Sequence, residues 1–398
     1  MNIKDLELLK SGFGDAFYLL DSSQFKRNFQ ELKAVFSSVY PRFNIAYSYK
    51  TNYTPRLCRI VDDLGGYAEV VSEMEMELAL KIGVKPENVI WNGPIKERKE
   101  AERFLLLGGV LNIDSLDELN LLKPIVNSHP DKEFRLGIRV NYDVGDGVVS
   151  RFGFDVAAPD FQECLDYVTS TSNVAFAGLQ CHFAKRNAEY WPARVNGMIK
   201  LIDRIGVVPK RIDLGGGIFG KMADSLKAQF TVTVPDYNAY AETIKGFADR
   251  FGEKGPELII EPGSALVGDC MRFVGTVKTV KQIRGKWFAS VLGSQKNISM
   301  SGVNPPIEIV HTGGKRKRFE SVDLVGYTCI EGDVLYKNYS GELAVGDSVI
   351  FGNCGSYSIV MKPPFILPNF PVVDIGKKKP ELIKYGETFD DLFHTFVY

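Results

Sequence analysis

The feature that most constrains this chain is a repeated alternation of short β-like runs and amphipathic stretches between about residue 40 and residue 261. The stretches between the runs, such as "SEMEMELALKIG" and "SLDELNLLKPIV", have helical periodicity. Strand–helix alternation favours right-handed βαβ units and a parallel sheet. The eight runs are FNIAYSY (43–49), YAEVV (67–71), VIW (89–91), VLNID (110–114), FRLGIRVN (134–141), FAGLQCH (176–182), RIDLG (211–215) and ELIIE (257–261).

Eight such units in about 220 residues predict a closed (β/α)8 barrel of the TIM type. The structural alternative is a doubly wound open sheet, but no G-x-G-x-x-G follows the first run. We expect a helix that is capped near Asp21 or Ser22, and Ser115 with Glu118 predicts a capping box. We therefore assign residues 21–261 to the barrel.

The residue pattern of the chain changes after Glu261. Runs such as "SVDLVGYTC" and "YSIVMK" alternate or cluster β-branched residues between glycine turns, and no convincing helix precedes the C-terminal tail. We predict an antiparallel β-domain from residues 262–398. The strand within residues 1–20 is expected to join it, because chain ends often meet in space.

Composition excludes several classes of partner. The chain has 48 Lys plus Arg against 49 Asp plus Glu, a balance that supports neither nucleic acid nor an anionic membrane as a partner. The charged start leads to no apolar signal segment, and the six cysteines lack the spacing of a metal site. We expect a cytoplasmic protein with free thiols, no metal and no membrane contact.

The residues that close the predicted strands carry the chemistry, because barrel active sites form at the carboxyl ends of the strands. Together they are the parts of a site for pyridoxal 5'-phosphate. The residues are Lys50, His182, Gly215, Gly216, Gly217 and Glu261, with Arg139 on the fifth run.

Each of these residues also has an ordinary structural interpretation. Lys50, in a hydrophobic pocket, could form a Schiff base with an aldehyde cofactor, or it could simply extend its amine to solvent. The segment "DLGGGIFG" (213–220), expected to open a helix, suits a phosphate through backbone amides and the helix N-terminus, or forms a tight turn. Glu261 could keep a pyridine nitrogen protonated, or pair with Arg139.

His182 and two further candidates, Cys329 and Tyr357, have the same double interpretation. His182 could stack on the cofactor or be a satisfied core histidine. Cys329 could return a proton to a carbanion or be a small buried residue. Tyr357 could contact phosphate or substrate, or be a half-buried strand tyrosine.

Taken in order, "YSYKTN", "CHFAKRN", "DLGGG", "EPG", "CIEGD" and "GSY" resemble the motifs of the fold-type III pyridoxal phosphate decarboxylases. These are the ornithine, arginine and diaminopimelate decarboxylases, and the similarity runs from about residue 15 to residue 375. The resemblance implies an alanine racemase-like barrel with a C-terminal β-domain and a carboxy-lyase that releases the α-carboxylate of an amino acid. It also implies a homodimer whose subunits share their active sites.

The resemblance further implies roles for individual residues. Lys50, His182, Glu261 and Cys329 would be catalytic. The cofactor would be held by Lys50, His182, Gly215, Gly216, Gly217, Glu261, Gly263, Ser264 and Tyr357. The substrate would meet Cys329, Glu331, Asp333 and Tyr357, and Cys329 and Asp333 would come from the partner subunit.

Departures from the family pattern bear on the substrate. Ala184 and Lys185 replace the usual Gly-Ser, and Lys185 could supply charge where the serine binds phosphate. Ser264 stands where diaminopimelate decarboxylases have arginine, Ile330 separates Cys329 from Glu331, and the Arg-Pro pair expected near 301–302 is missing. We therefore expect an unusual or modified amino-acid intermediate of siderophore, antibiotic or polyamine biosynthesis rather than meso-diaminopimelate.

Three alternatives remain. The chain could be a diaminopimelate or ornithine decarboxylase proper. It could be an amino-acid racemase of the same fold, which would need a partner tyrosine as its second base. It could also be a catalytically dead regulatory homologue, although such a protein has no reason to keep Lys50, Glu261 and Cys329 together.

Overall fold

A computed structural model describes residues 3–298, 304–312 and 314–397. By contacts the chain separates into two compact units, residues 26–220 with 234–265, and residues 1–25 with 221–233 and 266–398. We call the first the barrel unit and the second the β-unit. Segment 221–233, which the sequence analysis placed in the barrel, groups with the β-unit.

The barrel unit contains the eight predicted strands in a closed parallel sheet. Closure comes from the pairing of the last strand with the first, with Ile260 beside Ile45. The fold class predicted from the alternation is therefore confirmed. The strands are β2 (Phe43–Ser48), β3 (Tyr67–Val70), β4 (Val89–Trp91), β5 (Val110–Ile113), β6 (Phe134–Asn141), β8 (Val174–Gln180), β9 (Arg211–Asp213) and β10 (Glu257–Ile260). The short β7 (Phe154–Asp155) pairs in parallel with the end of β6.

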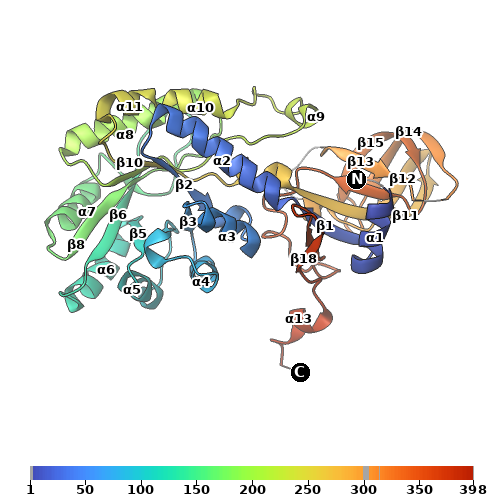
Figure 1. Ribbon diagram of the computed structural model, residues 1–398, viewed down its shortest axis with the longest axis horizontal. Helices are drawn as coiled ribbons and strands as arrows, with labels where there is room; N and C mark the ends of the chain where they lie inside the picture. Colours follow the sequence, from blue (N-terminus) through green and yellow to red (C-terminus); the bar gives the residue numbers. More distant parts are fainter. Residues whose placement is uncertain (1–2, 299–303, 313, 398) are drawn as a thin grey trace. The chain divides into compact units, whose positions relative to one another are not determined.

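Helices lie outside these strands (Figure 1) and bury their apolar faces against them. Inside the barrel, small and branched residues form a core cluster of Ala46, Ile90, Val110, Ala177 and Ile259. The helices are α2 (Ser22–Val39), α3 (Pro55–Asp63), α4 (Glu73–Lys81), α5 (Arg98–Leu106), α6 (Leu116–Ser128), α7 (Pro159–Ser170), α8 (Trp191–Ile205), α10 (Tyr237–Thr243) and α11 (Lys245–Phe251). Short 3-10 turns are η1 (Tyr49–Thr51), η2 (Pro86–Asn88) and η3 (Ala188–Tyr190).

The predicted helix caps are largely confirmed. Asp21 Oδ1 accepts from the amide of Gln24 at 2.9 Å, which caps α2. The Ser115 hydroxyl accepts from the amide of Glu118 at 3.3 Å, but the Glu118 carboxylate accepts from the amide of Asp114 instead of that of Ser115. The capping box is therefore half formed, because Glu118 also pairs with the buried amine of Lys96 at 2.6 Å.

The β-unit is a mostly antiparallel sheet in the order β15-β14-β12-β11-β1-β17-β18, with β16 pairing β11 and β13. The N-terminal strand joins it as predicted, with Phe17 beside Val274. Two pairs, β1–β17 and β12–β14, are parallel. The strands are β1 (Ala16–Leu20), β11 (Met271–Ile283), β12 (Lys286–Val291), β13 (Ile307–Val310), β14 (Lys317–Val325), β15 (Val334–Leu343), β16 (Ser348–Phe351), β17 (Val372–Asp374) and β18 (Glu381–Lys384).

Short helices were missed in this half of the chain. The residue pattern did not predict α1 (Ile3–Phe13), whose Leu6 and Leu9 pack on Phe17 and Val274. A helical turn also follows Glu261, so the expectation of no helix before the tail is wrong. The remaining elements are α9 (Asp224–Lys227), α12 (Ser264–Val267), η4 (Gly268–Cys270), η5 (Gln295–Ile298) and α13 (Phe389–Phe393). In the described part of the chain, no helix is long and apolar enough to cross a membrane.

Candidate active site

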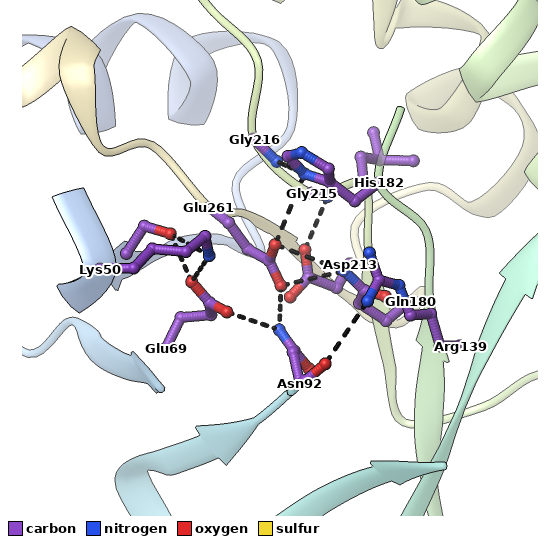
Figure 2. Close-up of polar contacts among 12 residues, drawn as sticks. Lys50, Glu69, Asn92, Arg139, Gln180, His182, Asp213, Gly215, Gly216 and Glu261 are labelled. Carbon is purple, nitrogen blue, oxygen red and sulfur yellow. Dashed lines mark hydrogen bonds and ion pairs between the residues drawn. The ribbon is translucent and has the colours of Figure 1, made fainter. Parts of the chain in front are cut away.

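Polar side chains gather where the barrel strands end (Figure 2). The structure brings together six residues that the sequence singled out, Lys50, Arg139, His182, Gly215, Gly216 and Glu261. The carboxyl ends of parallel strands open on one face of a barrel, and this places residues distant in sequence side by side. Four further members were not predicted, namely Glu69, Asn92, Gln180 and Asp213.

Lys50 lies in η1, directly after β2. Its Nζ is 2.5 Å from Glu69 Oε2 and 2.7 Å from Ser48 Oγ, and the Ser48 hydroxyl also donates to Glu69. Glu69 is 1% exposed, so the carboxylate of this ion pair is almost completely shielded from water. The amine is therefore compensated by a carboxylate and is not held in the hydrophobic pocket that we expected.

Glu261 directly follows β10, and its carboxylate is fixed by amides. Gln180 Nε2 donates to both carboxylate oxygens at 3.2 and 3.3 Å, and Asn92 Nδ2 donates to Oε1. Arg139 instead pairs with Asp114, with 3.1 Å between Nη1 and Oδ1. The alternative in which Glu261 pairs with Arg139 is therefore wrong.

Glu261 and Asp213 form a buried acid pair. Burial, and then the neighbouring Asp213 and Glu69 carboxyls, raise the pKa of Glu261 well above its usual value. Burial likewise raises the pKa of Asp213 to about 7, although its Oδ1 accepts from the amide of Gly215 at 2.8 Å. A cation beside the pair would lower both pKa values and favour the ionised carboxylates.

His182 stands two residues beyond β8. Its Nδ1 accepts from the amide of Gly216 at 3.0 Å, which leaves the ring proton on Nε2. Burial, assisted by the charges of Lys50 and Arg194, lowers the pKa of His182 well below its usual value. The ring is therefore neutral, and its 3.9 Å approach to Glu261 Oε2 is not an ion pair.

The glycine loop after β9 differs from the prediction. Residues 214–223 contain no helix, so no helix N-terminus faces an anion here, and only backbone amides can do so. A side chain at Gly215 would come within 2.2 Å of the Cys181 carbonyl, and one at Gly216 within 2.5 Å of the Glu261 carbonyl. Gly217 has a left-handed backbone, with φ of 83°.

The amides of this loop divide into two groups. Those of Gly215 and Gly216 already donate to Asp213 and His182. Those of Gly217 and Ile218 donate to no other group among the residues that the structure describes. Ile218 is buried and Gly217 is half-buried, and amides away from water rarely stay unpaired, so these two amides are the donors available to a bound anion.

Gly263 and Ser264 follow Glu261 at the start of α12. A Cβ at Gly263 would lie 1.9 Å from Thr51 Oγ1, so only glycine lets this segment pass beside the turn that carries Lys50. Ser264 is half-buried at the first position of the helix.

The other predicted site residues belong to the β-unit. Cys329 and Glu331 are exposed in the loop before β15, and Ile330 between them is 55% exposed. Asp333 is buried, and its carboxylate accepts four hydrogen bonds from Ser294, Gln295 and Thr328. Tyr357 is half-buried with φ of 61°. The Asp333 contacts favour an anchoring role in its loop over substrate contact, and the Arg-Pro position near 301–302 lies outside the described residues.

A signal for the missed residues was present in the sequence. Glu69 interrupts the buried run "YAEVV", Asn92 follows "VIW" directly, and Asp213 lies within "RIDLG". A polar residue at or just beyond the end of a buried barrel strand is placed at the site by topology.

Comparison with known proteins now places the chain. Residues 22–268 match the family model described as pyridoxal-dependent decarboxylase, pyridoxal binding domain. Curated relatives include a diaminopimelate decarboxylase of Aquifex aeolicus, 26% identical over 97% of this chain and 92% of that protein. Another is the L-glutamyl-[BtrI acyl-carrier protein] decarboxylase of Niallia circulans, 28% identical over 99% of this chain and 97% of that protein. Among solved structures, a diaminopimelate decarboxylase of M. jannaschii covers 98% of this chain and 94% of its own, with a TM-score of 0.86 and 21% identity.

The chain belongs to the pyridoxal-dependent decarboxylase family. It is a fold-type III carboxy-lyase with pyridoxal 5'-phosphate as its cofactor, as the ordered motifs predicted.

Proposed function

We propose that this decarboxylase removes the α-carboxylate of an amino-acid-derived intermediate whose far end is joined to another group, in a biosynthetic pathway of the cytoplasm. The observation that carries the proposal is the strand-end cluster. It combines one nucleophilic amine, Lys50, with a buried acid pair, Glu261 and Asp213, that calls for a cation.

The residues present fit pyridoxal phosphate. Lys50 would bind its aldehyde, Glu261 with Asp213 would face its ring nitrogen, and the amides of Gly217 and Ile218 would receive its phosphate. When bound, the cofactor supplies an electron sink for the pair of electrons left by carbon dioxide. A protonated ring nitrogen is the cation that would let the acid pair ionise.

Side chains of the protein would accept and donate the protons of the reaction. Glu69 Oε2, 2.5 Å from Lys50 Nζ, can accept a proton from the amine and expose its lone pair. The amide of Gly216 fixes the His182 ring with its proton on Nε2. Cys329, exposed and on a loop, would donate the proton that completes the product, from the partner subunit of a homodimer.

The substrate proposal is supported by the absence of two charged side chains from positions where diaminopimelate decarboxylases have them. Ser264 provides no guanidinium, and Ile330 displaces Glu331 from the position after Cys329, so groups that would bind a second charged end are absent from these positions. The name of the Niallia circulans relative gives a glutamyl group on an acyl-carrier protein as its substrate. A carrier-bound or similarly modified amino acid suits both observations.

A test of the substrate measures carbon dioxide release. The panel contains free meso-diaminopimelate, ornithine, arginine and glutamate. The carrier mimic is a glutamyl pantetheine thioester linked through the side-chain carboxyl, so that its α-carboxylate stays free. We expect release from a modified substrate and at least about tenfold less from the free acids, because the polar groups that would pair a free second end are lacking. Preferred turnover of free diaminopimelate would contradict the proposed substrate but would still agree with the assignment as a decarboxylase. Loss of optical activity without carbon dioxide would indicate a racemase.

A test of the site uses borohydride reduction of the holoprotein followed by peptide mapping. The reduced adduct should be found on Lys50, and Lys50→Ala should lack the visible absorption of the bound cofactor. An adduct on another lysine would overturn the assignment of the amine.

A test of the acid uses Cys329→Ala. The cofactor absorbance should match that of the parent, because the residue lies outside the barrel unit, while product formation should slow by about 100-fold or more. Turnover equal to that of the parent would show that another group donates the proton.

A further inference from the structure

A buried arginine lies behind the glycine loop. Arg194 is in the first turn of α8 and is 1% exposed. Its guanidinium carbon lies 4.5 Å from the ring centroid of Trp191 and 5.4 Å from that of Phe183. The backbone below it is fixed as well, because the Tyr142 hydroxyl donates to the Arg194 carbonyl at 2.6 Å. The cation is thus held in one place by aromatic packing.

Arg194 binds the carbonyl side of the loop. Nη1 donates to the carbonyl oxygens of Leu214 at 3.0 Å and Gly216 at 2.7 Å. By holding these two carbonyls, the guanidinium fixes the backbone of the loop. The next two amides along the chain, those of Gly217 and Ile218, have no acceptor in the described residues. A side chain that holds carbonyls on one side of a loop decides where its amides can point.

Part of the guanidinium is unused. Nε and Nη2 are buried and have no hydrogen-bond partner among the residues that the structure describes. Nη2 lies 3.7 Å from the position that a Cβ on Gly217 would take, so the unused end faces the loop. A buried cation with free donors is costly unless an anion compensates it. Lys185, suggested from sequence for this task, has an exposed side chain.

We propose that Arg194 is a positioning residue for the cofactor phosphate. It orders loop 214–218 through the two carbonyls and supplies the buried positive charge behind the amides of Gly217 and Ile218. This inference rests on the proposal that the loop holds the phosphate. It also accounts for a phosphate site in which Ala184 and Lys185 replace the usual Gly-Ser.

The experiment compares two ligands that differ only in the phosphate. Dissociation constants of pyridoxal 5'-phosphate and of pyridoxal are measured by absorbance titration of cofactor-free protein. For Arg194→Met we expect binding of pyridoxal phosphate to weaken by about 10- to 100-fold, the usual effect of losing hydrogen bonds to a charged group. Binding of pyridoxal should change by less than about threefold, since it lacks the phosphate.

Arg204→Met is the matched control. Arg204 is on the same helix, also donates to a backbone carbonyl, that of Val156, and also lies over an aromatic ring, that of Phe161, but it is exposed. Both ligands should bind this variant as they bind the parent. Equal weakening of both ligands in Arg194→Met would show a merely structural role, and no weakening of either would also overturn the proposal.

A second variant, Arg194→Lys, tests the proposal in case Arg194→Met does not fold. Arg194→Lys keeps the charge but cannot hold both carbonyls with a planar fork, so the preference for pyridoxal phosphate over pyridoxal should fall about 3- to 10-fold. An unchanged preference would overturn the role of the guanidinium. If the parent itself bound both ligands equally, the phosphate assignment of the loop would be wrong, and this outcome is distinct from a failure of Arg194 alone.

Discussion

Among single residues, Asp213 has the clearest consequence for pH. Burial raises the pKa of its carboxyl from an ordinary value near 3.8 to about 7. Between these values the folded cofactor-free protein keeps a proton that the unfolded chain has lost, so the contribution of Asp213 to stability falls as pH rises. A carboxyl that binds more protons in the folded state is stabilising only at low pH.

Asp213→Asn removes this dependence. The thermal midpoint of the cofactor-free variant should exceed that of the parent by about 2–5 °C at pH 8, with the difference shrinking toward pH 4. Asp249→Asn, which changes an exposed carboxyl on α11, should follow the parent at every pH. Midpoints of Asp213→Asn that run parallel to the parent from pH 4 to pH 8 would show that Asp213 ionises normally.

Single residues were predictable where position alone decides. Lys50, His182 and Glu261 follow buried runs, and the barrel topology sends such residues to one face. Their partners were not predictable, because Glu69, Asn92 and Gln180 are ordinary polar residues until three-dimensional contact gives them a role. The same holds for Arg194, whose position in the first turn of a helix says nothing of a loop twenty residues later.

At the scale of elements, hydrophobic patterning recovered all eight barrel strands within two residues of their bounds. It failed in the segment after β9, where "DLGGGIFG" continues as an extended loop with no helix, because consecutive glycines carry no helical preference. It also missed α12 and α1, and the apolar side chains of α1 pack on the sheet at Phe17 and Val274, a tertiary contact that local patterning does not reveal.

Glycine turns in the β-unit make an element-scale prediction. A Cβ at Gly355 would lie 1.7 Å from the carbonyl oxygen of Val267, a backbone atom that cannot rotate away. Gly355→Ala should therefore destabilise the folded protein by about 2–3 kcal/mol, measured as a lowered thermal midpoint. Gly332→Ala in the loop before β15 has nothing within 4 Å of the added carbon and should leave the midpoint unchanged. A Gly355→Ala midpoint equal to that of the parent would contradict the clash.

For the whole molecule, the proposed shared sites can be tested by mixing inactive chains. Lys50→Ala and Cys329→Ala should each be nearly inactive, yet co-expression should restore about a quarter of the parent activity, because half of randomly paired dimers contain one intact site. Light scattering checks that the mixture is dimeric. Activity that stays at the level of the single variants would mean that each subunit builds its site alone.

The pairing of β1 has a consequence for synthesis on the ribosome. Its five residues, Ala16–Leu20, all become buried, yet their partners in β11 and β17 begin about 250 and 350 residues later. At elongation rates of about 5–20 residues per second, this apolar segment stays without its strand partners for roughly ten to fifty seconds before β11 is synthesised. The central part of the β-unit sheet can therefore form only after β11 and β17 have been synthesised.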